Sequence, residues 1–170
     1  MKQFSLFDNS EDSISIKTEK DNAKQTEKAI KEFAFDIEAT GSAPLSDRIV
    51  GLSLCFNKEQ AYYIPIRHTQ GQNITDALNI LKEIFEDESI SKIGHNLKYD
   101  ILILRQEDIH LSGRLYDTMI ASYLLNPNKP DHSLEDIALE YLSHKKKRFG
   151  DVLGKRESFS EISIEEATPY

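Results

Sequence analysis

The chain has 170 residues, of which 39% are hydrophobic, and it carries a formal net charge of −8 at pH 7. That length and apolar content suffice for one domain with a core, and they exclude a globally disordered chain. The negative charge argues against broad, unspecific attraction to nucleic acid, but not against an enzyme that reaches phosphates through bound metal cations.

Residues 1–30 contain few apolar side chains after Phe7 and no periodic pattern, which predicts a flexible leader and a folded domain over residues 31–170. No run reaches the ~18 apolar residues of a membrane span, and the N-terminus lacks the apolar core of a signal peptide. We therefore expect a cytoplasmic protein with no membrane partner. The single cysteine, Cys55, is expected to be a buried structural thiol.

Three strand-like runs follow the leader, at 33–39, 48–56 and 61–66. The short, turn-rich links between them are typical of an antiparallel meander. The spacing of apolar residues then changes and predicts an amphipathic helix over 75–87.

The rest of the chain alternates between strand and helix patterns. Short strands are predicted at 91–96 and 114–117, and helices at 97–105, 118–125 and 133–142. The predicted N-terminal caps of the helices are Thr75, Asn96, Asp117 and Ser133. This order predicts an α/β fold in which a mixed five-stranded sheet carries helices on its faces. The basic run "HKKKR" (144–148) is expected to be a solvated loop, with contact to a phosphate as the alternative.

Two acids, Asp36 and Glu38, interrupt the apolar run "FAFDIEA". Side chains two apart on a strand share a face, so Phe33, Phe35 and Ile37 are expected to face the core and the acids the opposite side. Neighbouring carboxylates repel each other unless a cation lies between them, and hard ions such as Mg²⁺ prefer oxygen ligands. Two such ions can activate water and stabilise the leaving oxygen of a phosphodiester. The pattern fits either a metal site or two solvated acids on an exposed strand edge.

A third acid, Asp100, follows in the segment "GHNLKYD", one helical turn after Asn96 and on the same helix face. Beside the apolar "ILIL" a lone acid would be costly to bury unpaired, although an acid near a helix N-terminus also interacts favourably with the helix dipole. Three acids at the ends of strand and helix units occupy the usual place of a site in an α/β sheet.

Four segments in the same order, "FAFDIEAT", "IGHNLKYD", "YDTMIASYLLNP" and "HSLEDIALEYL", resemble the 3′→5′ exonuclease domain of bacterial DNA polymerase I. That domain belongs to the DEDD superfamily and has a ribonuclease H-like fold. The resemblance covers residues 31–170. It implies removal of nucleotides from a single-stranded DNA 3′ end by two-metal hydrolysis, with Mg²⁺ (or Mn²⁺ or Zn²⁺) as cofactor. A polymerase domain in the same parent chain would be its partner.

The resemblance also implies a role for each matching acid. Asp36 would bridge both metal ions, and Glu38 would hold one of them and help to position the attacking water. Asp100 would hold the second ion.

Four neighbouring residues match family positions around the substrate. Asn96 and Tyr99 would contact the single-stranded 3′ end, and Thr40 and Gly41 would lie near the terminal nucleotide through backbone contacts. A packing role for Tyr99 and a simple turn at Thr40 and Gly41 are the alternatives.

The third motif of the family is a tyrosine followed four residues later by an aspartate. Tyr170 matches the tyrosine, which would hydrogen-bond the attacking water, but the aspartate is not in this sequence. With Thr168 as N-cap and Pro169 in the first turn, a helix is expected to begin here. We therefore expect a fragment of a longer polypeptide that is weakly active or inactive by itself.

The leader segment "QFSLF" is similar to the pentapeptide by which bacterial replication proteins bind the sliding clamp. Gln3, Leu6 and Phe7 are the candidate contact residues, with the latter two as apolar anchors for a groove. An incidental linker sequence is the alternative.

Two other functions are alternatives to proofreading, the removal of nucleotides from a DNA 3′ end that the resemblance implies. One is a vestigial, non-catalytic exonuclease-like domain that supports a polymerase, and the presence of all three acids argues against it. The other is an RNA exonuclease of the ribonuclease D type. The segments "GHNLKYD", "YDTM" and "FGDVLGK" favour the polymerase type over it.

Overall fold

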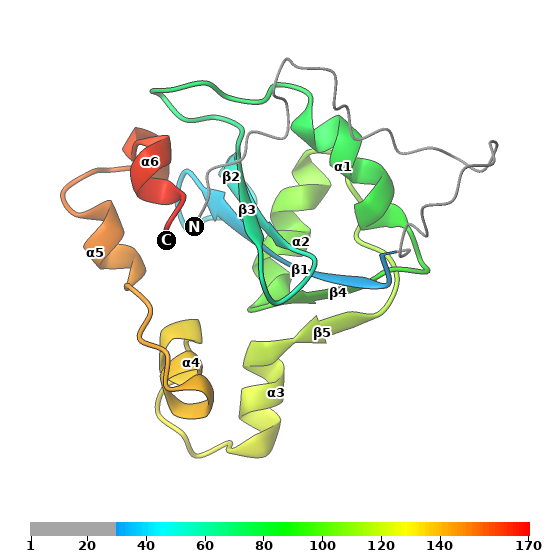
Figure 1. The fold of residues 1–170 in the computed structure, drawn as a ribbon, viewed down its shortest axis with the longest axis vertical. Coiled ribbons are helices and arrows are strands. Elements are labelled where there is room, and N and C mark those ends of the chain that lie inside the picture. Colours follow the sequence, from blue (N-terminus) through cyan, green and yellow to red (C-terminus); the bar gives the residue numbers. More distant parts are fainter. Residues whose placement is uncertain (1–29) are drawn as a thin grey trace.

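A five-stranded sheet forms the centre of the computed structural model, which describes residues 30–170. The strands are β1 (Glu32–Ala39), β2 (Ile49–Cys55), β3 (Ala61–Pro65), β4 (Ser91–Gly94) and β5 (Leu115–Asp117). Their order is β3-β2-β1-β4-β5, with β1, β2 and β3 antiparallel and β4 and β5 added parallel to β1 (Figure 1). The predicted mixed sheet is confirmed. The predicted leader, with its clamp-like Gln3, Leu6 and Phe7, lies outside the described residues.

Helices cover the sheet and extend beyond its β5 edge. They are α1 (Ala77–Glu86), α2 (Leu97–Gln106), α3 (Thr118–Leu125), α4 (Leu134–Leu142), α5 (Phe149–Leu153), the 3-10 helix η1 (Phe159–Glu161) and α6 (Ile164–Ala167). The first four agree with the predicted helices to within two residues at each end. The last three were not predicted, although the sequence carries a capping signal for η1: Ser158 and Glu161 form a reciprocal capping box.

The structure confirms two of the predicted helix caps, and a third takes the cap position without the capping bond. The side chain of Asp117 accepts from the backbone N–H groups of Met119 and Ile120, and that of Ser133 accepts from Asp136, which confirms these two caps. Asn96 occupies the cap position of α2 with φ 62°, but its side chain makes no capping hydrogen bond.

Two predicted caps are wrong. Helix α1 follows Asp76 rather than Thr75, and it begins without a side-chain capping bond. Thr168 ends a helix instead of starting one, because Ser163 already caps α6 and the Thr168 hydroxyl donates to the Ile164 carbonyl at 2.6 Å.

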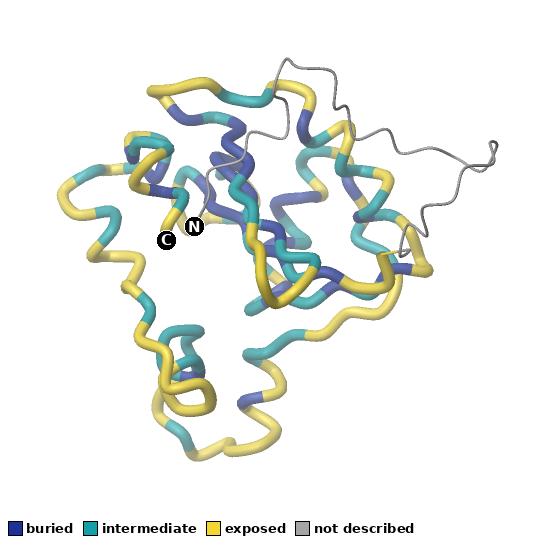
Figure 2. The backbone as a smooth tube through the Cα atoms, viewed as in Figure 1, coloured by how far each residue is buried: buried dark blue, intermediate teal, exposed yellow. Residues whose placement is uncertain are grey.

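One face of β1 builds the main core. Phe33, Phe35 and Ile37 are at most 5% exposed, as their alternation predicted. Phe35 meets Phe85 of α1 edge-to-face, with ring centroids 5.1 Å apart. Helices α1 and α2 close this side of the sheet, and Figure 2 shows its buried strands at the centre of the molecule. Burying one such phenylalanine contributes about 1.5–3 kcal/mol, so this face anchors β1.

The opposite face of the sheet, called the outer face below, has a β-bulge next to Glu38. Glu38 pairs with Gly51 and the next residue pairs with Ile49, so Val50 is the extra residue. Val50 packs on this side in a second small core with Phe159 and Ile162. The bulge therefore gives η1 and α6 their attachment to the sheet.

Cys55 is only half-buried, in contrast to the expected buried thiol, and its Sγ lies 2.9 Å from the Asn57 carbonyl. It lines a cavity on the outer face. Within residues 30–170, no helix is long and apolar enough to cross a membrane.

Gly51 is packed too tightly to accept a side chain. A Cβ there would lie 1.9 Å from Oη of Tyr63, which a 2.6 Å hydrogen bond ties to Nε2 of His68. We expect Gly51→Ala to lower the free energy of unfolding by about 1–3 kcal/mol through overpacking. Gly150→Ala is the control, since outside its own helix no described residue has an atom within 4 Å of its Cβ position. Urea denaturation measures both variants, and unchanged stability of Gly51→Ala would contradict this packing.

Candidate active site

The two acids of β1 lie on its outer face, in the middle strand of the sheet. Asp36 is half-buried and Glu38 is only 8% exposed. The alternative of two solvated acids on an exposed strand edge is therefore wrong, because β1 has a hydrogen-bonded neighbour on each side.

Helix α2 brings Asp100 to the same place. The chain leaves β4 at Gly94, turns through His95 and Asn96 and enters α2. The left-handed conformation of Asn96 is one that asparagine tolerates better than most residues. A Cβ at Gly94 would lie 2.3 Å from Cδ2 of Leu97, so any larger residue here would displace that buried side chain. Asp100, one turn into the helix, is 2% exposed.

The carboxylate of Asp117 holds this turn in position. It accepts hydrogen bonds from the backbone N–H groups of Asn96 at 3.1 Å and Leu97 at 2.8 Å, as well as from Met119 at 2.9 Å and Ile120 at 3.3 Å. One side chain thus joins the N-termini of α2 and α3. The sequence pattern predicts only its cap of α3, because the bonds to α2 join residues 20 and 21 positions apart.

Burial raises the pKa of all three acids, and the charge of Asp36 adds to the rise at Glu38 and Asp100. Burial, and then the charge of Asp36, raises the pKa of Glu38 to about 8. Burial and the charges of Asp36 and Asp117 raise the pKa of Asp100 to about 8. Burial also raises the pKa of Asp36, against the lowering effect of Lys146. Near neutral pH this cluster keeps protons that ordinary carboxyls would lose.

A cavity of about 260 Å³ opens beside these acids. Of the predicted site residues, it is lined by Asp36, Asn96, Tyr99, Asp100 and Tyr170. Glu38 does not line this cavity, but it is near it: burial raises the pKa of Tyr99 and Tyr170, and the charge of Glu38 adds to the rise at both. The fold therefore brings together residues from β1, α2 and the end of the described chain.

Thr40 and Gly41 lie at the end of β1 and do not line the cavity. The Thr40 hydroxyl donates to Asp47 at 3.1 Å and accepts from the Arg48 N–H at 3.1 Å, so it is engaged within its own hairpin. The Tyr99 hydroxyl donates to the Gly41 carbonyl at 2.6 Å, which fixes the tyrosine ring at the cavity.

Three ionisable residues of the cavity were not predicted as site residues: His95, Glu135 and Lys146. In the sequence, His95 stands beside the predicted site residue Asn96, and Lys146 belongs to the basic run 144–148. These positions could have indicated that both lie at the site. Glu135 carried no signal beyond its place in the first turn of α4.

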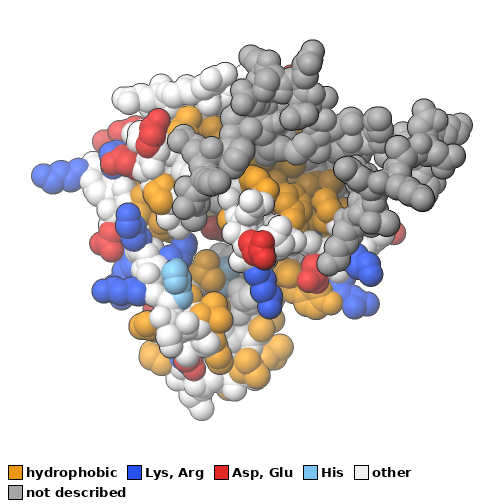
Figure 3. All heavy atoms as spheres, viewed as in Figure 1, with side chains coloured by type: hydrophobic (Ala, Val, Ile, Leu, Met, Phe, Trp, Pro, Cys, Tyr) orange, Lys and Arg blue, Asp and Glu red, His pale blue; other side chains and the backbone are white. Residues whose placement is uncertain are grey.

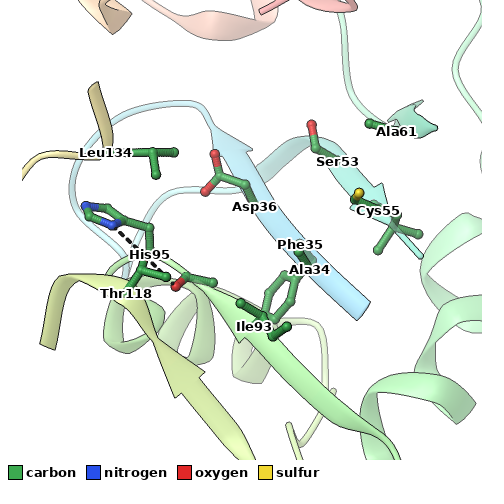
Figure 4. Close-up of a pocket in the computed structure, with 12 residues that line it drawn as sticks. Ala34, Phe35, Asp36, Ser53, Cys55, Ala61, Ile93, His95, Thr118 and Leu134 are labelled. Carbon is green, nitrogen blue, oxygen red and sulfur yellow. Dashed lines mark hydrogen bonds between the residues drawn. The ribbon is translucent and has the colours of Figure 1, made fainter. Parts of the chain in front are cut away.

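His95 also lines a second cavity, of about 250 Å³, where Figure 4 shows it near Asp36. The Thr118 hydroxyl donates to the Gly94 carbonyl at 3.1 Å and lies 2.9 Å from Nδ1 of His95. A hydroxyl has one proton, so Nδ1 must be the donor in this pair. Nε2 is then a buried acceptor with no hydrogen-bond partner among the described residues.

The donor set fits a hard divalent cation. In residues 30–170, no three His, Cys, Asp or Glu side chains are already arranged as a metal site. Oδ2 of Asp100, however, is buried without a hydrogen-bond partner in that part of the chain. An unpaired buried carboxylate oxygen costs free energy that a cation removes. Asp36, Glu38 and Asp100 offer the oxygen ligands that Mg²⁺ prefers.

Comparison with known proteins finds exonucleases and DNA polymerases. A family model described as 3′-5′ exonuclease matches residues 12–170. The DNA polymerase I of Pseudomonas aeruginosa is 37% identical over 148 residues, a match that covers 81% of this chain and 16% of that protein. The chain thus spans a small part of the length of this relative.

Solved structures show the same fold. Brucella melitensis NrnC with bound Mg²⁺ has a TM-score of 0.59 and 26% identity, covering 70% of this chain and 57% of that one. Escherichia coli RNase D, an exoribonuclease involved in structured RNA processing, has a TM-score of 0.61 and 20% identity, covering 82% of this chain and 34% of that one. These neighbours confirm the predicted ribonuclease H-like fold.

The raised pKa values predict a pH-dependent stability. Folding moves the pKa values of Glu38 and Asp100 from 4.5 and 3.8 to about 8, so the folded chain binds extra protons between those values. Without metal, its free energy of unfolding should therefore fall as the pH rises from about 4 to 8. Asp100→Asn removes one titrating group and should reduce this fall by on the order of 2 kcal/mol.

Urea denaturation in EDTA across this pH range measures the effect. Asp76→Asn, at an exposed position, is the matched control and should keep the wild-type slope. Identical slopes for Asp100→Asn and wild type would show that Asp100 does not titrate in this way.

Proposed function

The chain belongs to the 3′-5′ exonuclease family found in DNA polymerase I, and we propose that it removes nucleotides from DNA 3′ ends by two-metal hydrolysis. The observation that carries this proposal is the cluster of Asp36, Glu38 and Asp100, three acids that repel one another beside an open cavity. Such a cluster is stable in its ionised form only with cations present.

Two Mg²⁺ ions are the proposed cofactors, with Mn²⁺ or Zn²⁺ as alternatives. Asp36 would contribute to both ions, Glu38 to one and Asp100 to the other. Oδ2 of Asp100, which has no hydrogen-bond partner within residues 30–170, supports this, as does the Mg²⁺ bound to the similar NrnC. Bound ions of this kind lower the pKa of water and stabilise charge on the leaving oxygen.

The remaining cavity residues would bind and orient the substrate. Burial raises the pKa of Tyr170, so its phenol stays neutral and can donate a hydrogen bond to the attacking water. Asn96 and Tyr99 would contact the single-stranded 3′ end. Thr40 and Gly41 would approach the terminal nucleotide through their backbone, and the bond from Tyr99 to Gly41 supports a common surface.

The proposed substrate is DNA, because the family match and the curated relative are of the polymerase I type. The likeness to RNase D supports the fold alone. A polymerase domain in the parent chain is the proposed partner, and the clamp contact through Gln3, Leu6 and Phe7 stays a prediction. That this chain by itself is weakly active or inactive likewise stays a prediction.

Asp36→Asn should reduce the Mg²⁺-dependent cleavage rate by on the order of 10³-fold, because it removes the carboxylate proposed to serve both ions. The substrate is a single-stranded DNA oligonucleotide labelled at its 5′ end, and stepwise shortening of the labelled strand reports removal from the 3′ end. Calorimetric titration with Mg²⁺ should show weaker metal binding by the variant.

Asp76→Asn is the control and should cleave at the wild-type rate. An RNA oligonucleotide of the same sequence tests the alternative substrate, and faster RNA cleavage would favour the ribonuclease type. Absence of both metal binding and cleavage in the wild type would favour a non-catalytic domain.

A further inference from the structure

The basic run His144–Arg148 contains one residue that differs from its neighbours. Lys146 is half-buried and lines the cavity beside the acids, whereas the other four residues of the run are exposed. Figure 3 shows Lys and Arg side chains gathered, next to a histidine, on the side of the molecule where the segment between α4 and α5 lies. Lys146 is therefore the lysine of this run that lies at the site.

Lys146 is held over Tyr170. Its Nζ lies 4.1 Å from the centroid of the tyrosine ring, a distance at which an ammonium is attracted to the ring face. The raised pKa of Tyr170 keeps the phenol neutral, so the contact is a cation–π interaction rather than an ion pair. Lys146 therefore sits beside the residue proposed to orient the attacking water.

Among residues 30–170, the ammonium of Lys146 has no carboxylate partner at ion-pair distance. None of the ion pairs formed within residues 30–170 includes it. Its charge nevertheless lowers the pKa of both Asp36 and Glu38, so it lies close enough to act on the acid cluster. An ammonium has three donors, and none of the hydrogen bonds described for this part of the chain uses them.

Bound cations would compete with Lys146 for the two acids. With the acids occupied by metal, the ammonium would need another anion at the same cavity. A phosphate supplies that anion, and lysine binds phosphate well as a compact point charge. A neutral nucleoside would offer no such partner.

We propose that Lys146 binds a phosphate of the nucleotide at the substrate's 3′ end and positions it beside Asp36 and Tyr170. This inference rests on the proposed function and adds a substrate-binding residue to it. The competing explanation is that Lys146 is only a counter-ion that stabilises the acid cluster.

The test compares the binding of thymidine 5′-monophosphate with that of thymidine, which lacks the phosphate. Binding is measured by calorimetry or by NMR titration, both with Mg²⁺ and in EDTA. Lys146→Gln removes the charge, and Lys147→Gln removes an exposed charge from the next position as the matched control. Lys146→Arg restores a cation. Equal melting temperatures of the variants verify that they fold.

With Mg²⁺ present, Lys146→Gln should weaken binding of the monophosphate about tenfold, the effect of losing one charge-assisted hydrogen bond. It should leave the affinity for thymidine unchanged. Lys147→Gln should stay within about twofold of the wild type, and Lys146→Arg should recover most of the lost affinity.

The proposal is overturned if Lys146→Gln weakens both ligands equally or neither of them, since a phosphate contact affects only the monophosphate. That result leaves the proposed exonuclease function intact as long as the wild type binds the monophosphate. If the wild type binds neither ligand in either buffer, the nucleotide site itself is absent and both proposals fail.

Discussion

Repulsion among buried carboxyls is the constraint on which the rest of the site depends. Asp36, Glu38 and Asp100 are brought together where water is scarce, and the pKa of each is raised. Holding them together opposes folding unless protons or cations neutralise them. Packing of the core must supply the free energy that offsets this repulsion. The aromatic residues behind β1 are part of that core.

Hydrogen bonds that hold the backbone of β1 and α2 oppose this repulsion. β1 is hydrogen-bonded on both sides, which leaves its acids no freedom to splay apart along the sheet. Asp117 binds the first N–H groups of α2 and α3, so the helix that carries Asp100 cannot tilt away without losing them. Each of these bonds is worth about 1.5–3 kcal/mol, since the acceptor is charged.

The last segment of the chain, from η1 to Tyr170, completes the cavity. The bulge at Val50 provides the apolar contact for Phe159 and Ile162, and this attachment brings Tyr170 over the acids. The contact between Lys146 and Tyr170 then links the loop after α4 to the same place. A cation and a neutral phenol thereby reach a cluster that is otherwise acidic.

The sequence by itself determined which side chains share a face and where most helices begin. Alternation in "FAFDIEA" separated the aromatic residues from the acids, because strand geometry has a period of two. Capping by Asp117 and Ser133 was equally readable, since each involves residues within three positions. The motifs around Asp36 and Asp100 indicated the family by their order.

Only the tertiary structure decided how deeply the acids are buried and what surrounds them. The central place of β1, the bonds from Asp117 to α2 and the selection of Lys146 all depend on contacts between residues far apart in the chain. Local patterns carry no information about such pairs, because their energies arise only after the elements pack. The error at Thr168 has a local cause instead: Ser163 caps α6 by accepting from the Glu166 N–H three positions later, so the helix begins before Thr168.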